Sequence, residues 1–141
     1  ETVGISASMF EEFIFPYQLS LLERFGLNCY GCCEPLDSRW HVVERFPRLR
    51  RVSMSPWANV GAMAERLGNR YIFSWKPHPG VLAADTFDED LVRQTLRRGL
   101  RALTKNDCRV EIIMKDCHTI RHDPQRVIRW VQIAKEEAEA I

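Results

Sequence analysis

Thiol and imidazole side chains gather in two short segments that lie far apart along the chain. Three of the five cysteines, Cys29, Cys32 and Cys33, fall within five residues, and Cys117 is followed directly by His118. Thiolate and imidazole are the ligands that zinc prefers, and a catalytic zinc keeps three protein ligands and one open position. The predicted metal ligands are therefore Cys32, Cys33, Cys117 and His118.

A plainer interpretation of the same thiols stays open. Cys32 and Cys33 are adjacent rather than two residues apart, so the spacing is not that of a zinc ribbon. Free cysteines are often buried like small hydrophobic residues, which is what we expect of Cys29 and Cys108. The remaining thiols could then merely line a pocket. Glu34 could bind a metal, act as a base or cap the following turn.

A second segment with chemical potential is the proline-rich loop that contains Lys76 and His78. Prolines fix the backbone and hold neighbouring side chains at low entropic cost. We predict that Lys76 and His78 are catalytic and orient anionic groups of a ligand, with a solvated loop as the alternative. Trp57 and Trp75 are predicted to stack on a flat cofactor, although aromatic residues at such positions also pack into cores.

The elements that must position these residues are strands and helices in alternation. A leading helix is expected at about residues 8–26, split or kinked at Pro16. Helix starts are predicted at Ser8, Asp37, Asn59, Thr86 and Asp123. The predicted strands are Leu27–Cys32, Leu49–Met54, Tyr71–Trp75 and Val110–Met114.

Four strand-helix units call for an α/β fold with parallel strands. They amount to the C-terminal half of a (β/α)8 TIM-type barrel, in a single domain of residues 1–141. Ligands of such folds bind at the carboxyl ends of the strands. Every segment described above follows a predicted strand, so we expect the candidate residues to converge there.

Composition excludes several function classes. A net charge of +1 gives no reason to expect nucleic acid or an anionic membrane as a partner, and a small-molecule substrate is expected instead. The clustered, odd-numbered cysteines favour a reducing, cytoplasmic setting. Residues 1–5 carry no export signal, and the absence of an initiator Met suggests a fragment of a longer protein.

The order of several short motifs resembles one enzyme superfamily across nearly all 141 residues. The motifs are Ser8-x-x-x-Glu12-Phe13-x-x-Pro16-Tyr17, Gly31-Cys32, Lys76-Pro77-x-Pro79, Lys115-Asp116-Cys117 and Pro124-x-Arg126-x-x-x-Trp130. In this order they are similar to the second half of the barrel in the uroporphyrinogen decarboxylase and cobamide-dependent methyltransferase superfamily. The resemblance therefore implies the same half barrel as the strand pattern.

The resemblance also implies a zinc site, because the methyltransferases of this superfamily hold zinc with a His-x-Cys pair and a late Cys. Carried onto this sequence, the pair falls on Tyr30 and Cys32, and the late Cys on Cys117. Tyr30 departs from the pattern, so Cys33, Glu34 or His118 must replace the histidine, or zinc is absent. The implied zinc binds and activates a thiol, and a cobamide is carried by a partner corrinoid protein.

Three functions remain open at this stage. The first is a zinc-thiolate, cobamide-dependent methyltransferase, and the second is a decarboxylase-like enzyme acting on a carboxylated pyrrole or a related acid. The third is an isolated half barrel that is inactive by itself. We also expect the chain to form a homodimer, because two strand edges and inward residues such as Ile72, Ile112 and Met114 would lack a cover.

Overall fold

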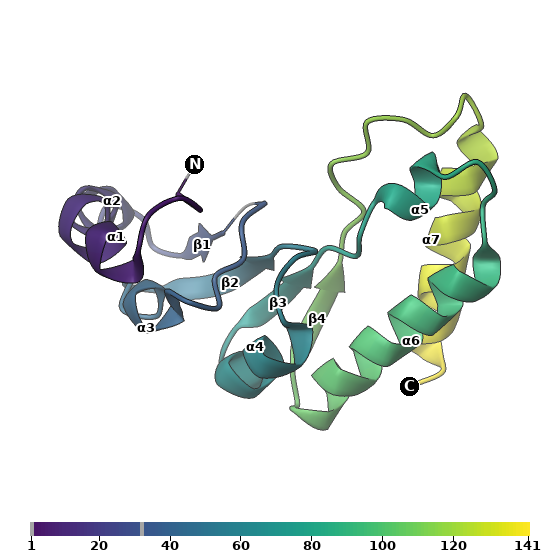
Figure 1. Cartoon of the computed structure of the whole chain (residues 1–141). Coiled ribbons are helices and arrows are strands. Elements are labelled where there is room, and N and C mark those ends of the chain that lie inside the picture. Colours follow the sequence, from purple (N-terminus) through teal and green to yellow (C-terminus); the bar gives the residue numbers. More distant parts are fainter. Residues whose placement is uncertain (1, 32) are drawn as a thin grey trace.

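The computed structural model describes residues 2–31 and 33–141, and its centre is a parallel sheet of four strands (Figure 1). The strands lie in chain order, and each neighbouring pair is parallel. They are β1 (Asn28–Tyr30), β2 (Leu49–Met54), β3 (Ile72–Trp75) and β4 (Arg109–Ile112). The α/β class and the parallel sheet expected from the alternation of strands and helices are confirmed.

Helices precede the sheet and connect its strands (Figure 1). The leading helix is divided, as Pro16 predicts, into α1 and α2 with the break at Ile14. The helices are α1 (Ala7–Phe13), α2 (Phe15–Leu22), α3 (Trp40–Val43), α4 (Val60–Leu67), α5 (Gly80–Ala83), α6 (Glu89–Lys105) and α7 (Pro124–Glu139), with a 3-10 turn η1 (Gly68–Arg70). None of the described helices is both long and apolar enough to cross a bilayer.

Two of the five predicted helix caps are confirmed. The side chains of Asn59 and Asp123 accept hydrogen bonds from the first turns of α4 and α7. The cap of α1 is Ser6 rather than Ser8, and the cap of α6 is Asp88 rather than Thr86. Asp37 caps no helix, since α3 begins later and the Asp37 carboxylate accepts the backbone N–H of Asn59 instead.

The two faces of the sheet differ in chemistry because successive side chains of a strand point to opposite sides. Val52, Met54, Phe73 and Trp75 are buried on the side of the helices, where the Trp75 ring lies against Gly99 of α6. The alternate residues are polar apart from Ile72, and Arg51 of β2 forms an ion pair with Glu111 of β4. We call these the helix face and the polar face.

One expected inward residue proves to lie on the helix face. Ile112 lines a groove together with Leu100 of α6 and Trp130 of α7, so the prediction that it faces inward is wrong. Glu111, its neighbour in β4, occupies the polar face through its pairing with Arg51. The register with β3 pairs Ile112 with Trp75, which faces the helices, so the predicted alternation was one residue out of phase at β4.

Candidate functional site

The loops that follow the two outermost strands meet over the carboxyl ends of the sheet. The Cys33 thiol, after β1, donates to Oδ2 of Asp116, after β4, at a distance of 3.2 Å. The Lys115 ammonium lies 3.8 Å from the same sulfur. In a flat sheet β1 and β4 would be about 14 Å apart, since neighbouring strands are separated by about 4.8 Å. The two loops therefore reach across the strands between them.

Local backbone geometry brings the first of these loops into place. Gly31 has φ 103°, and a Cβ at this position would lie only 2.3 Å from the carbonyl oxygen of Ser53. Only glycine lets the end of β1 approach β2 so closely. The buried Ser55 hydroxyl then donates to the carbonyl of Cys33 at 2.8 Å and accepts the N–H of Trp57 at 3.1 Å. Ser55 thus ties the loops after β1 and β2 together.

The second loop turns sharply at the residue that meets Cys33. Asp116 has φ 62°, in the left-handed region that non-glycine residues enter rarely and Asp more readily than most. Backbone strain of this kind clusters at binding and active sites. Cys117 follows Asp116, and the residue is exposed although neighbouring atoms exclude part of the water around its sulfur. This partial desolvation, together with the negative charge of Asp116, raises the pKa of the Cys117 thiol.

The contact between Cys33 and Asp116 has the dimensions of a pair of metal ligands. A tetrahedral zinc bound at about 2.3 Å to sulfur and about 2.0 Å to oxygen holds these two atoms about 3.5 Å apart. The observed separation of 3.2 Å is close to this value. Across residues 2–31 and 33–141, no group of three or more His, Cys, Asp and Glu side chains is arranged for metal binding.

The predicted metal ligands have different positions. Cys33 lies at the meeting point of the two loops, whereas Cys117 and His118 are exposed in the loop after β4. Cys32 lies outside the described residues. The Glu34 carboxylate accepts hydrogen bonds from the N–H and hydroxyl of Thr2, at 2.5 and 2.7 Å, and lies 3.5 Å from the Arg39 guanidinium. Glu34 therefore anchors the N-terminal segment.

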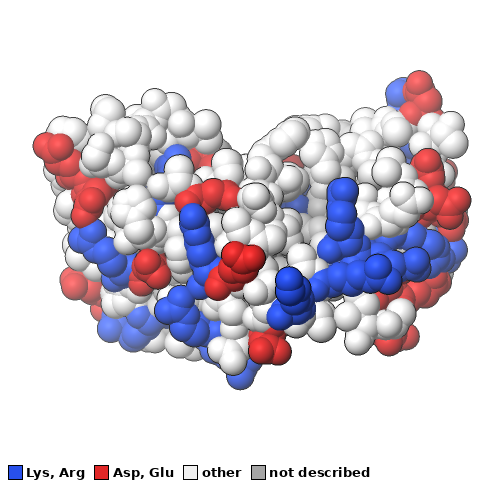
Figure 2. Space-filling view, turned by 60° about the horizontal axis from the view of Figure 1, so that its bottom comes forward, with Lys and Arg blue, Asp and Glu red and all other residues white. Residues whose placement is uncertain are grey.

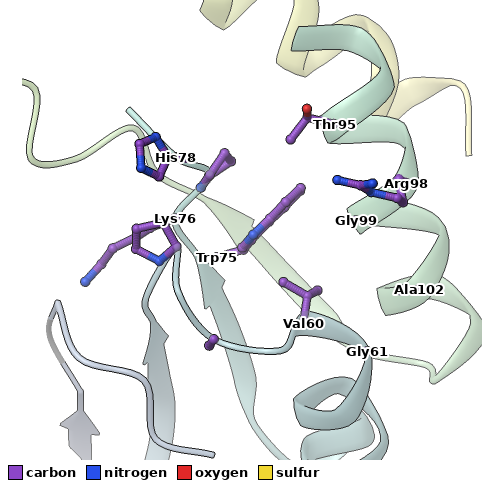
Figure 3. Close-up of a pocket in the computed structure, with 12 residues that line it drawn as sticks. Val60, Gly61, Trp75, Lys76, His78, Thr95, Arg98, Gly99 and Ala102 are labelled. Atoms are coloured by element: carbon purple, nitrogen blue, oxygen red, sulfur yellow. The ribbon is translucent and has the colours of Figure 1, made fainter. Parts of the chain in front are cut away.

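The two predicted catalytic residues follow β3 and diverge. Lys76 is 3% exposed, and Figure 3 shows its amine directed away from Trp75 and α6. His78 is exposed and contacts Trp57 edge to face, with the ring centres 4.8 Å apart. Trp75 points to the helix face, where its ring packs on Gly99. The structure thus brings Trp57 to His78 and separates Trp75 from the Lys76 amine.

Three residues of this site were missed by reasoning from sequence. Asp116 and Lys115 stand beside Cys117 in a strand-end segment, so their residue types were a usable signal for a charged partner of a thiol. Ser55 carried no such signal, because serine is common in loops of every kind. Its role appears only from the two hydrogen bonds that join the loops.

No protein family, curated protein or solved structure matches the chain.

Proposed function

We propose that the chain is the C-terminal half of a (β/α)8-barrel enzyme similar to the uroporphyrinogen decarboxylase and cobamide-dependent methyltransferase superfamily. The reaction is methyl transfer to or from a thiol held by zinc. The observation that carries the proposal is the contact of Cys33 with Asp116 across the carboxyl ends of the strands. It supports a curved sheet with one central site, as in a barrel, and it joins a thiol with a carboxylate.

Zinc would be held by Cys33 and Asp116, with Cys32 or Cys117 as the further protein ligand. When bound, zinc supplies a positive charge that keeps a substrate thiol in its nucleophilic thiolate form. The Lys115 ammonium, 3.8 Å from the Cys33 sulfur, offsets part of the negative charge of such a ligand set. Lys76, buried at the end of β3, orients an anionic group of the substrate.

The reaction also needs residues and a methyl carrier beyond this chain. The carrier would be a cobamide on a partner corrinoid protein, and the other half of the barrel would close the site. The 141 residues alone are therefore expected to bind metal without turning over substrate. A reducing, cytoplasmic location fits a site built on free thiols.

Zinc content of the chain purified without chelators tests the proposal. We expect about one equivalent, and at least about tenfold weaker zinc binding in Cys33→Ser and Asp116→Asn. Cys108→Ser is the matched control, since the Cys108 sulfur contacts the carbonyl of Ala64 near the opposite end of β4 and should leave zinc binding unchanged. Less than about a tenth of an equivalent in the unaltered chain would exclude a resident zinc.

The second candidate function is a decarboxylase-like enzyme on a carboxylated pyrrole or related acid. The buried ammonium of Lys76 favours it, because such a cation suits a carboxylate substrate. This reaction does not need the thiols. A chain without zinc that still binds a pyrrole carboxylate, and loses that binding in Lys76→Met, would favour the decarboxylase over the methyltransferase.

A further inference from the structure

A cavity of about 400 Å³ lies outside the thiol site, between the carboxyl end of β3 and helix α6. Its size is within the range of small-molecule sites. Figure 3 shows Trp75 pointing from the strand toward α6, with Thr95 and Arg98 on the facing side of the helix. His78 lines the same cavity from the loop after β3.

Arg98 gives this cavity a positive charge that the described residues do not neutralise. Its neighbours on α6, Arg93 and Arg97, form ion pairs with Glu136 and Glu137 of α7. Among residues 2–31 and 33–141, no ion pair or hydrogen bond is found for the Arg98 side chain. Figure 2 shows Lys and Arg side chains in a band on the surface, and Arg97, Arg98 and Arg101 line a hollow on α6. An anion is attracted to such a surface.

His78 is held as a hydrogen-bond donor. Its Nδ1 accepts the backbone N–H of Gly80 at 3.0 Å, so this nitrogen carries no proton. The neutral ring therefore has its proton on Nε2. Gly80 is needed for the contact, because a Cβ there would lie 2.8 Å from Nδ1 of His78. The edge-to-face contact with Trp57 fixes the ring from another side.

Most of the remaining wall of the cavity is apolar, and Lys76, which also lines it, directs its amine away from Trp75 and α6 (Figure 3). Trp75, Val60, Pro56 and Pro77 line it, and Trp75 is 4% exposed. An occupant must therefore combine an acceptor group near Arg98, Thr95 and His78 with a flat apolar body. A guanidinium group matches a carboxylate in a two-point contact, and one unneutralised guanidinium balances one negative charge.

We propose that this cavity binds an aromatic monocarboxylate. Its carboxylate accepts hydrogen bonds from Arg98, Thr95 and His78, and its ring lies along Trp75 and Val60. The site is separate from the thiols after β1 and β4, and it does not depend on the proposed methyl transfer.

Titration of the 141-residue chain with sodium benzoate, followed by the indole N–H signal of Trp75 in nitrogen-15 NMR spectra, tests the proposal. We expect saturable binding, and at least about tenfold weaker binding in Arg98→Gln, because hydrogen bonds to charged groups are the stronger ones. Acetate, which lacks the ring, should also bind at least about tenfold more weakly than benzoate.

Arg101→Gln is the matched control, since Arg101 is an exposed arginine of the same helix that does not line the cavity. It should change benzoate affinity less than about twofold, because only general charge attraction is lost. Equal losses in Arg98→Gln and Arg101→Gln would overturn the proposal, as would benzoate binding that leaves the Trp75 signal unshifted. Far-UV circular dichroism and the midpoint of thermal unfolding verify that both variants are folded.

Discussion

The helix face and the polar face belong to the same four strands but are built for different surroundings. On the helix face Val52, Met54 and Phe73 have no exposed surface at all. On the polar face the Arg51 and Glu111 side chains are 32% and 39% exposed and pair with each other. Most of the buried apolar surface of the strands therefore lies on one face, while the other face remains compatible with water or with a polar ligand.

This contrast alters the reason for expecting a homodimer. If the inner face were apolar, exposing it would cost about 1.5–3 kcal/mol for each large side chain. Because Arg51, Ser53, Ser74 and Glu111 are polar, that cost applies at the centre of this face to Ile72 alone among the strand residues. Self-association remains a proposal that rests on the unpaired outer edges of β1 and β4. Sedimentation at micromolar concentration, where a single 16.5 kDa species would contradict it, is the appropriate test.

The largest expected difference between the faces is in β3. Phe73→Ala should lower the free energy of unfolding by about 3–5 kcal/mol, because it removes a fully buried ring and leaves a cavity. Ile72→Ala, at the preceding and partly exposed position, should cost about 1 kcal/mol. Urea unfolding of both variants measures the two values. If the free energy of unfolding fell by similar amounts in the two variants, the two faces would be equally packed.

A smaller effect is expected where α6 touches the helix face. A Cβ on Gly99 would lie 2.2 Å from the Trp75 ring, so Gly99→Ala should destabilise the chain by about 1–3 kcal/mol. Gly61→Ala is the control, since its nearest neighbour would be 3.6 Å away and alanine favours a helix by about 0.5–1 kcal/mol. The midpoint temperature of thermal unfolding should therefore fall in Gly99→Ala and rise in Gly61→Ala. A stable Gly99→Ala chain would show that the Trp75 ring moves freely.

The smallest effect is expected on the polar face. A double-mutant cycle of Arg51→Met and Glu111→Gln should give a coupling of about 0.2–1 kcal/mol at neutral pH, as for other partly exposed pairs. Burial alone would raise the pKa of Glu111, but the nearby Ser74 hydroxyl and the hydrogen bond and charge of Arg51 hold the pKa below its ordinary value.

The sign of the pH effect follows from that lowered pKa. Glu111 stabilises the folded chain above the unfolded pKa of about 4.3, and the contribution is lost as the pH falls through the lower folded value. The coupling should thus be undiminished at pH 7 and should weaken as the pH falls below the unfolded pKa of about 4.3 and through the lower folded value. A coupling that persists in acid would mean that Arg51 and Glu111 interact through packing rather than charge.

The strands were predictable because each is a short segment that carries strand-forming residues and lies between turn signals. Leu49–Met54 was predicted to the residue, and Asn59 and Asp123 stand at helix starts where their side chains can cap only one turn. The helix-cap predictions were wrong where several residues that can cap a helix stand close together, as Ser6 and Ser8 do, because the local sequence does not distinguish between them. A shift of one residue at β4 was enough to misplace Ile112.

The positions of single residues in the candidate site could be predicted from the sequence, but the contacts between them could not. That Cys33 lies after one strand and Asp116 after another follows from the sequence. That the two meet depends on a left-handed turn at Asp116 and on Gly31, whose lack of a side chain admits the Ser53 carbonyl. The opposite directions of Lys76 and Trp75 follow from strand alternation once the end of β3 is known.

The proposed zinc-thiolate site is tested most directly by zinc K-edge X-ray absorption of the zinc-loaded chain. We expect two sulfur ligands at about 2.3 Å, from Cys33 and a second thiol, together with an oxygen near 2.0 Å from Asp116. Cys33→Ser should reduce the sulfur signal, and Cys108→Ser should leave it intact. A spectrum with only nitrogen and oxygen ligands, or one that Cys33→Ser does not change, would contradict the central claim.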